Sequence, residues 1–310
     1  MAVTLTNLSN QLYEDSRRRL NVSARRSGIA DIRSYDIGDL RSTPFFNDNR
    51  SILDQPFGIG YWLWKPYIIL ETLKSVKEGD IVVYADSGLE IIAPLEPLYE
   101  ICRNGNPVLL FGNSNFTNDA WTKRDNFILM DCDRPAFWYA SQVDAAFSLF
   151  QRSEASLSFV SQWLDYCRDP RNLTDMANTL GKRNLPAYIQ HRWDQSVLSL
   201  MAAKRGVSLY RMPSQFGNHY KAPGLRMENE FNCVNQYNQT PVDYYAPIPY
   251  YNSLYPQLLD HHRGRSQQAN SRSKKDSPMD FLLRVIRKRY NRWMNAYALR
   301  REMRKRNPQS

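Results

Sequence analysis

The stretch GDIVVYADSG, residues 79–88, decides the fold of this chain. The residues between Asp80 and Asp86 are all apolar or aromatic, and three of them are β-branched, which is typical of a strand covered on both faces. The preceding stretch, GYWLWKPYIILETL (residues 60–73), predicts a helix that starts at Pro66, because proline is favoured in a first helical turn. A helix followed by a buried strand indicates an α/β architecture.

The segments on either side continue this alternation of helical and strand-like patterns. Apolar residues recur at helical spacing from Leu157 to Cys167, and again in a helix that Gly206 would end. We therefore predict an α/β layer architecture, with helices packed against a sheet. The other expected elements are a helix over 16–26, a strand over 29–35 and a strand over 207–210.

Length and composition exclude several classes of protein. With 310 residues, 42% of them hydrophobic, the chain can bury a real core and is not disordered. It has no apolar run of the roughly 18 residues that span a membrane, and its start does not resemble a secretion signal. The four cysteines are widely spaced, which argues against a zinc knuckle or a disulfide framework. We expect a cytoplasmic protein.

The net charge of +10 is concentrated in the C-terminal tail. Residues 261–310 hold 15 of the 41 Lys and Arg residues but only three of the 31 acidic ones, so the rest of the chain is nearly neutral. This distribution disfavours nucleic acid as a partner of the body of the protein. We predict a globular domain over residues 1–263, a polar linker over 264–278 and a basic amphipathic helix over 279–310.

Carboxylates at strand ends are the first candidates for chemistry, because ligands of open α/β sheets bind at the carboxyl ends of strands. Asp86 follows the buried strand and precedes the turn Ser87-Gly88. A carboxylate placed there can hold a divalent cation such as Mn²⁺ or Mg²⁺, which in turn bridges a diphosphate. The alternative is that Asp86 only caps the turn. Asp131 and Asp133 form a second possible chelating pair, although we favour a surface turn for them.

The segment before the helix at Pro66 is unusually aromatic. It holds Trp62 and Trp64, whose rings can stack on bases or sugars, and Lys65, which at a helix start can meet a phosphate. The alternative is that both tryptophans are core residues.

Asp194 and Gln195 open the helix that ends near Gly206. At such a position Asp194 can serve as a general base or orient an acceptor hydroxyl, while Gln195 donates a hydrogen bond. A plain N-cap role for Asp194 is the alternative. The cluster around His262 and Arg263 can grip phosphate, or can simply begin the basic tail.

Four segments together resemble a known family. They are GYWLWKPYIILETL, GDIVVYADSG, TKRDNFILMDCD (residues 122–133) and LPAYIQHRWDQSVLSLMAAKRGV (residues 185–207). In order and spacing they resemble nucleotide-sugar-dependent glycosyltransferases of GT-A type, from bacterial and viral polysaccharide synthesis. The resemblance covers roughly Tyr13 to His262.

The resemblance implies an α/β fold of GT-A (Rossmann-like) type, with a mixed, mainly parallel sheet flanked by helices. It also implies roles for particular residues. Asp86 falls where such enzymes carry an Asp-x-Asp metal motif, but only one carboxylate is present, so Lys65 or Arg263 is an alternative means of neutralising the diphosphate. Asp194 and Gln195 match a pair placed beside the transferred sugar, which makes them the expected catalytic residues. The expected donor-binding residues are Asp86, Ser87, Lys65, Trp64, His191, His262 and Arg263.

The function implied is hexosyl transfer from a nucleotide-diphosphate sugar to a saccharide or lipid-linked saccharide. The basic tail fits peripheral binding to the anionic inner face of a membrane, where glycolipid acceptors lie. Two other classes stay open, a non-catalytic carbohydrate-binding protein and a nucleic-acid-binding protein.

Overall fold

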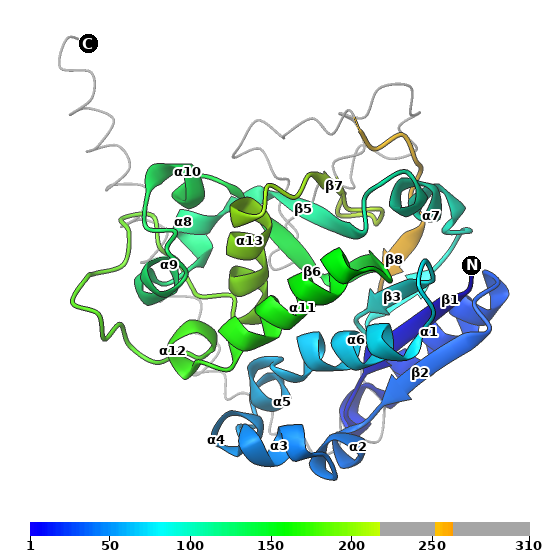
Figure 1. Ribbon diagram of the computed structural model, residues 1–310, viewed down its shortest axis with the longest axis horizontal. Coiled ribbons are helices and arrows are strands. Elements are labelled where there is room, and N and C mark those ends of the chain that lie inside the picture. The colour runs from blue at the N-terminus through cyan, green and yellow to red at the C-terminus, as the bar shows by residue number, and fades with distance from the viewer. Residues whose placement is uncertain (218–251, 263–310) are drawn as a thin grey trace, which may run out of the picture.

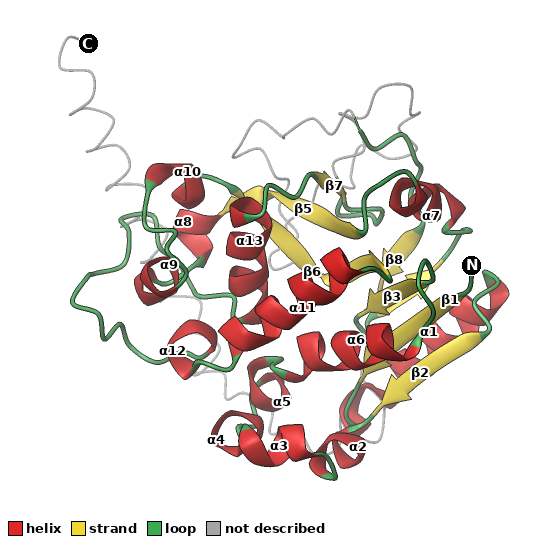
Figure 2. Ribbon diagram, viewed as in Figure 1, coloured by secondary structure: helices red, strands yellow, loops and turns green. Residues whose placement is uncertain are grey.

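In a computed structural model of the protein, residues 1–217 and 252–262 are described. Their centre is a six-stranded sheet (Figures 1 and 2). In spatial order its strands are β2 (Asp31–Tyr35), β1 (Val3–Leu8), β3 (Ile81–Ala85), β6 (Ser141–Gln151), β5 (Val108–Thr117) and β7 (Leu209–Arg211). The linker over 264–278, the basic helix over 279–310 and Arg263 lie outside the described residues.

Strand direction defines the edge at which the site lies. β1 pairs in parallel with β2 and β3, and β5 pairs in parallel with β7. β6 is antiparallel to both of its neighbours, β3 and β5. The carboxyl ends of β3 and β5 therefore meet the amino end of β6 at one edge. This mixed, mainly parallel sheet confirms the predicted fold class.

Helices cover both faces of the sheet. On one face, α6 (Trp64–Ser75), α11 (Glu154–Cys167) and α13 (Asp194–Lys204) bury a core with Val82, Tyr84 and Phe150 of the strands. On the other, α1 (Glu14–Arg26) and α7 (Glu96–Arg103) pack on Ile81 and Val83. Neighbouring strand residues thus face opposite cores, which explains why β3 is apolar throughout.

Short elements complete the described fold. They are a 3₁₀ turn (Gln11–Tyr13), α2 (Ile37–Arg41), α3 (Pro44–Asp48), α4 (Arg50–Leu53), α5 (Gly58–Tyr61), α8 (Asn118–Trp121), α9 (Arg124–Leu129), α10 (Pro135–Trp138) and α12 (Pro170–Leu173). The chain returns at β8 (Leu259–His261), which pairs antiparallel with β4 (Leu89–Ile91). Within the described residues, no helix is long and apolar enough to cross a membrane.

Most of the elements expected from the sequence are present, with shifted ends. α1 begins two residues before the expected helix, and α6 begins at Trp64, so that Pro66 lies inside its first turn. Of the predicted surface turn at Asp131-Cys132-Asp133, Asp131 lies in an exposed turn, whereas Cys132 is fully buried. There Asp133 binds Arg124 at 2.9 Å and Lys182 at 2.8 Å, so its carboxylate has two cationic partners of its own.

Candidate functional site

Asp86 lies at the end of β3, beside the middle of β6. Its backbone N–H donates to the carbonyl of Ala146 at 2.7 Å, which holds this residue against β6 just beyond the last strand pair. Its carboxylate accepts a hydrogen bond of 2.5 Å from the hydroxyl of Tyr84. The side chain is still 37% exposed. Asp86 therefore offers solvent a carboxylate whose direction is fixed.

Lys65, in the first turn of α6, lies behind this carboxylate and is buried. Its Nζ lies 2.8 Å from Oδ2 of Asp194 and 3.5 Å from Oδ1 of Asp86, and it donates to the carbonyl of Ala145 at 3.0 Å. Burial acts to lower the pKa of Lys65, but the charges of Asp194 and Asp86 outweigh it, so the pKa is raised. Lys65 is therefore a buried, permanently charged link between two carboxylates.

Asp194 is the first residue of α13, and its side chain is 4% exposed. Trp193, just before it, has φ 53° and ψ −123°, and no side chain caps the helix. The N-cap alternative for Asp194 is therefore wrong, because its carboxylate binds Lys65 instead. Burial raises the pKa of Asp194 to about 6, although Lys65 acts to lower it. Such a carboxylate is ionised at neutral pH and is more basic than an ordinary one.

Gln195 belongs to a buried chain of amides. Its Nε2 donates to Oε1 of Gln142 at 2.9 Å. The Nε2 of Gln142 donates in turn to Asn118 and Thr122, each at 3.0 Å. This network fixes the start of α13 against the amino end of β6, so the position of Asp194 is set from two sides.

The other expected donor-binding residues are placed differently. Trp64 is buried, and its Nε1 donates to the carbonyl of Gly58 at 3.0 Å. His191 is 1% exposed, with Nε2 2.8 Å from the carbonyl of Asn172, and burial lowers its pKa to about 3. Both contacts are structural, so donor binding by these two side chains stays a prediction.

Ser87 and His262 lie beside Asp86 in space. Ser87 is the half-buried residue that follows Asp86 in the turn, and the backbone N–H of His262 donates to the carbonyl of Gly88 at 2.9 Å. Burial lowers the pKa of His262, and so does the charge of Arg19. The end of the described chain thus returns to the turn that carries Asp86.

The residues around Asp86 do not fit a divalent cation held by the protein alone. In the part of the chain that the structure describes, no group of three or more His, Cys, Asp or Glu side chains is arranged to hold a metal ion. The Oδ1 of Asp86 already faces the hydroxyl of Tyr84 and the ammonium of Lys65, whose charge opposes a cation. A role for Mn²⁺ or Mg²⁺ at Asp86 stays a prediction.

Two contributors to the site are not among the residues expected from the sequence. Tyr84 could have been found from the sequence, because residues two apart in a strand point to the same face. Tyr84 and Asp86 are two apart, and the Tyr84 hydroxyl donates to the Asp86 carboxylate. Gln142 gives no such signal, because its partners come from two distant segments, Asn118–Thr122 and the start of α13.

Comparison with known proteins gives matches of fold only. No model of a protein family matches the chain, and no curated protein matches it in sequence. Among solved structures, it is similar to mouse xyloside xylosyltransferase 1 in its apo form, with 10% identity, a TM-score of 0.43, and coverage of 85% of this chain and 98% of that one.

Two further solved structures are similar to the chain. For the apo WbbM bifunctional glycosyltransferase the identity is 13% and the TM-score 0.45, over 85% of this chain and 46% of that one. For the galactosyltransferase LgtC in complex with donor and acceptor sugar analogs, the identity is 12% and the TM-score 0.41, over 84% of this chain and 87% of that one. All three proteins are glycosyltransferases, the class that the sequence resembles. Their activities are those of the three proteins themselves.

Proposed function

We propose that the chain is a glycosyltransferase that moves a sugar from a nucleotide-diphosphate sugar to a hydroxyl of a saccharide or lipid-linked saccharide. The observation that carries the proposal is the ionic cluster of Lys65, Asp86 and Asp194 at the carboxyl end of β3. Open α/β sheets bind their ligands at this edge. A buried ammonium between two carboxylates is also a common source of the shifted pKa values found at functional sites.

In the proposed reaction each member of the cluster has its own role. Asp86, which reaches solvent, contacts the donor. Asp194 accepts the proton of the attacking hydroxyl or stabilises the positive charge that develops on the sugar as the diphosphate leaves. Lys65 keeps Asp194 ionised and in place, since it lowers the pKa that burial alone would raise further. Gln195 is held by Gln142 at the start of the same helix.

Release of nucleotide from a panel of UDP-, GDP-, CMP- and dTDP-sugars tests this proposal. We expect the purified protein to release nucleotide from one donor, and Asp194→Asn to lower that rate by a factor of about 10²–10⁴, the usual contribution of an acid or base. Asp165→Asn is the matched control, because that side chain is 61% exposed and distant in the chain. Binding of a sugar or nucleotide without any release would favour a non-catalytic binding protein.

The basic tail suggests where the acceptor lies. Residues 261–310 carry 15 Lys and Arg residues with Phe281, Ile286 and Trp293 among them, a composition that suits an anionic membrane surface. We propose a peripheral position on that surface, close to lipid-linked saccharides. Co-sedimentation with vesicles containing anionic lipid should be lost when residues 266–310 are deleted, and unchanged binding would contradict this placement.

A further inference from the structure

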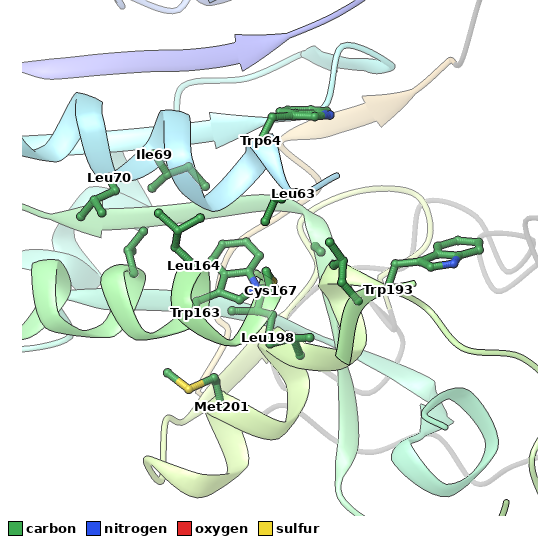
Figure 3. Close-up of a cluster of buried hydrophobic side chains, with 14 of the residues drawn as sticks. Leu63, Trp64, Ile69, Leu70, Trp163, Leu164, Cys167, Trp193, Leu198 and Met201 are labelled. Atoms are coloured by element: carbon green, nitrogen blue, oxygen red, sulfur yellow. The ribbon is translucent and has the colours of Figure 1, made fainter. Parts of the chain in front are cut away.

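Three aromatic side chains that the ionic cluster does not include gather beside it. The ring of Trp193 lies 4.6 Å from that of Phe57 and 5.1 Å from that of Trp62, and the rings of Phe57 and Trp62 are 5.4 Å apart. We call these three residues the aromatic cluster. Trp193 is 9% exposed and belongs to the same buried core as Trp163 (Figure 3). Phe57 is 44% exposed, so the cluster reaches the surface.

The backbone that carries the aromatic cluster is strained. Ile59, Tyr61 and Trp62 have φ of 55°, 54° and 61°, and Trp193 has φ of 53°. These values lie in the left-handed region, which costs free energy for any residue with a Cβ. A strained backbone persists where the surrounding structure enforces it, and it is concentrated at ligand sites. Here it brings together two tryptophans from segments far apart in the chain, with their ring planes tilted by 30°.

Each tryptophan is joined directly to a member of the ionic cluster. The carbonyl of Trp62 accepts from the backbone N–H of Lys65 at 2.9 Å. Trp193 immediately precedes Asp194 in the chain. The aromatic cluster and the ionic cluster are therefore carried by the same two backbone segments.

The charge beside the aromatic cluster selects among ligands that stack on rings. The Nε1 of Trp193 donates to the carboxylate of Asp175 at 2.9 Å, and Asp175 is exposed. Burial raises the pKa of the Tyr61 hydroxyl, and the charge of Asp175 raises it as well. A negative edge repels the phosphates of a nucleotide, whereas carboxylates and hydroxyls are suitable partners for the hydroxyls of a neutral sugar.

We infer that Phe57, Trp62 and Trp193 form a stacking platform for a neutral sugar ring of the acceptor saccharide, with Asp175 receiving its hydroxyls. This assignment rests on the proposed function and names the acceptor side of that site. The faces of aromatic rings can stack on the apolar faces of pyranose rings. The indole N–H of Trp193 donates to Asp175 and so holds this carboxylate beside the rings.

Saturation-transfer NMR with neutral methyl glycosides of glucose, galactose, mannose and N-acetylglucosamine tests the platform in the full-length protein. We expect saturation to reach the ring protons of at least one glycoside. Phe57→Ala should weaken that binding about tenfold, and Phe57→Tyr should retain it. Phe57 is 44% exposed and is not itself a core residue, and Phe57→Tyr keeps its ring against Trp193. Tyr139→Ala is the matched control, since Tyr139 is 54% exposed and contacts Trp138 edge-on.

Thermal shifts with UDP, GDP, CMP and dTDP, measured on the same variants, separate this proposal from the proposed function. Nucleotide binding that is unchanged in Phe57→Ala, together with weakened glycoside binding, supports the platform. No saturation with any glycoside, or saturation that is equal in Phe57→Ala, overturns it. Loss of nucleotide binding in Phe57→Ala would assign the rings to the donor base and would overturn it as well. Glycoside binding that depends on Phe57, without any nucleotide binding, would support the platform but contradict the proposed transferase function.

Discussion

The Nζ of Lys65 lies 2.8 Å from Oδ2 of Asp194, and the two side chains are only 3% and 4% exposed. One residue belongs to the first turn of α6 and the other to the first turn of α13, so this ion pair joins two helices at the point where both approach the end of β3. Buried charges are costly unless they are paired. The pair therefore acts both as part of the proposed site and as a structural requirement.

Lys65→Met should strongly destabilise the protein. Removing the ammonium leaves the buried carboxylate of Asp194 without its partner, which costs about 3–5 kcal/mol in comparable cases. Lys74→Met, on the same helix, should change the free energy of unfolding by less than about 1 kcal/mol, because its pair with Glu71 is exposed. Urea unfolding of both variants checks the difference. Adding Asp194→Asn to Lys65→Met should restore much of the loss, and equal losses at Lys65 and Lys74 would contradict the buried pair.

Gly60→Ala should disturb the left-handed turn between α4 and α6. A Cβ at Gly60 would lie 2.6 Å from Cα of Leu53 and 2.9 Å from the carbonyl of Ile52. Gly79 has a similar φ, +85° against +80°, but open space around it. Gly79→Ala should cost about 1–2 kcal/mol from conformation alone. Gly60→Ala should cost about 1–3 kcal/mol more from the clash. Thermal unfolding followed by circular dichroism measures the stability of both variants. An equal loss of stability in Gly60→Ala and Gly79→Ala would contradict the close packing of Gly60 against Leu53.

His191 should contribute to destabilisation in acid. In the folded state its pKa is lowered to about 3, whereas the unfolded chain binds a proton near the ordinary value of 6.5. The unfolded state therefore holds more protons below pH 6.5, and this part of the stability is lost as the pH falls toward 3, by about 1.4 kcal/mol for each pH unit. His191→Gln, which keeps a donor for Asn172, should flatten the slope. An unchanged slope between pH 6.5 and 4 would show that His191 is not held neutral.

Activity should depend on the ionisation of Asp194. With a pKa of about 6, raised mainly by burial, its base form is present above pH 6 and is lost as the pH falls below it. We expect kcat/KM to decline below about pH 6, and the residual activity of Asp194→Asn to lack this limb. A wild-type limb near pH 4 would instead indicate an ordinary, exposed carboxylate.

Local sequence signals predicted the parts of the fold that depend on local physics. The strand β3 (Ile81–Ala85) is apolar and rich in β-branched residues because both of its faces are buried, and it was predicted from that pattern. The position of Asp86 at a strand end followed from that strand alone.

Long-range pairing could not be predicted in the same way. Nothing near Lys65 in the sequence indicates that its ammonium turns inward to Asp194 and the carbonyl of Ala145. The N-cap rule for Asp194 failed because tertiary burial and the partner on α6 override a local preference. The antiparallel insertion of β6 between β3 and β5 likewise depends on contacts between distant segments.

The most direct test of the central claim is a thermal-shift panel of UDP-, GDP-, CMP- and dTDP-sugars, each with Mn²⁺ or with EDTA, on wild type, Asp86→Ala and Asp165→Asn. A ligand that binds only the folded state must raise the melting temperature. We predict a rise with one donor in wild type and Asp165→Asn that is lost in Asp86→Ala, and its persistence in EDTA would show that no metal is required. No rise with any donor, or an equal rise in Asp86→Ala, would contradict the assignment of this strand end to a nucleotide-sugar.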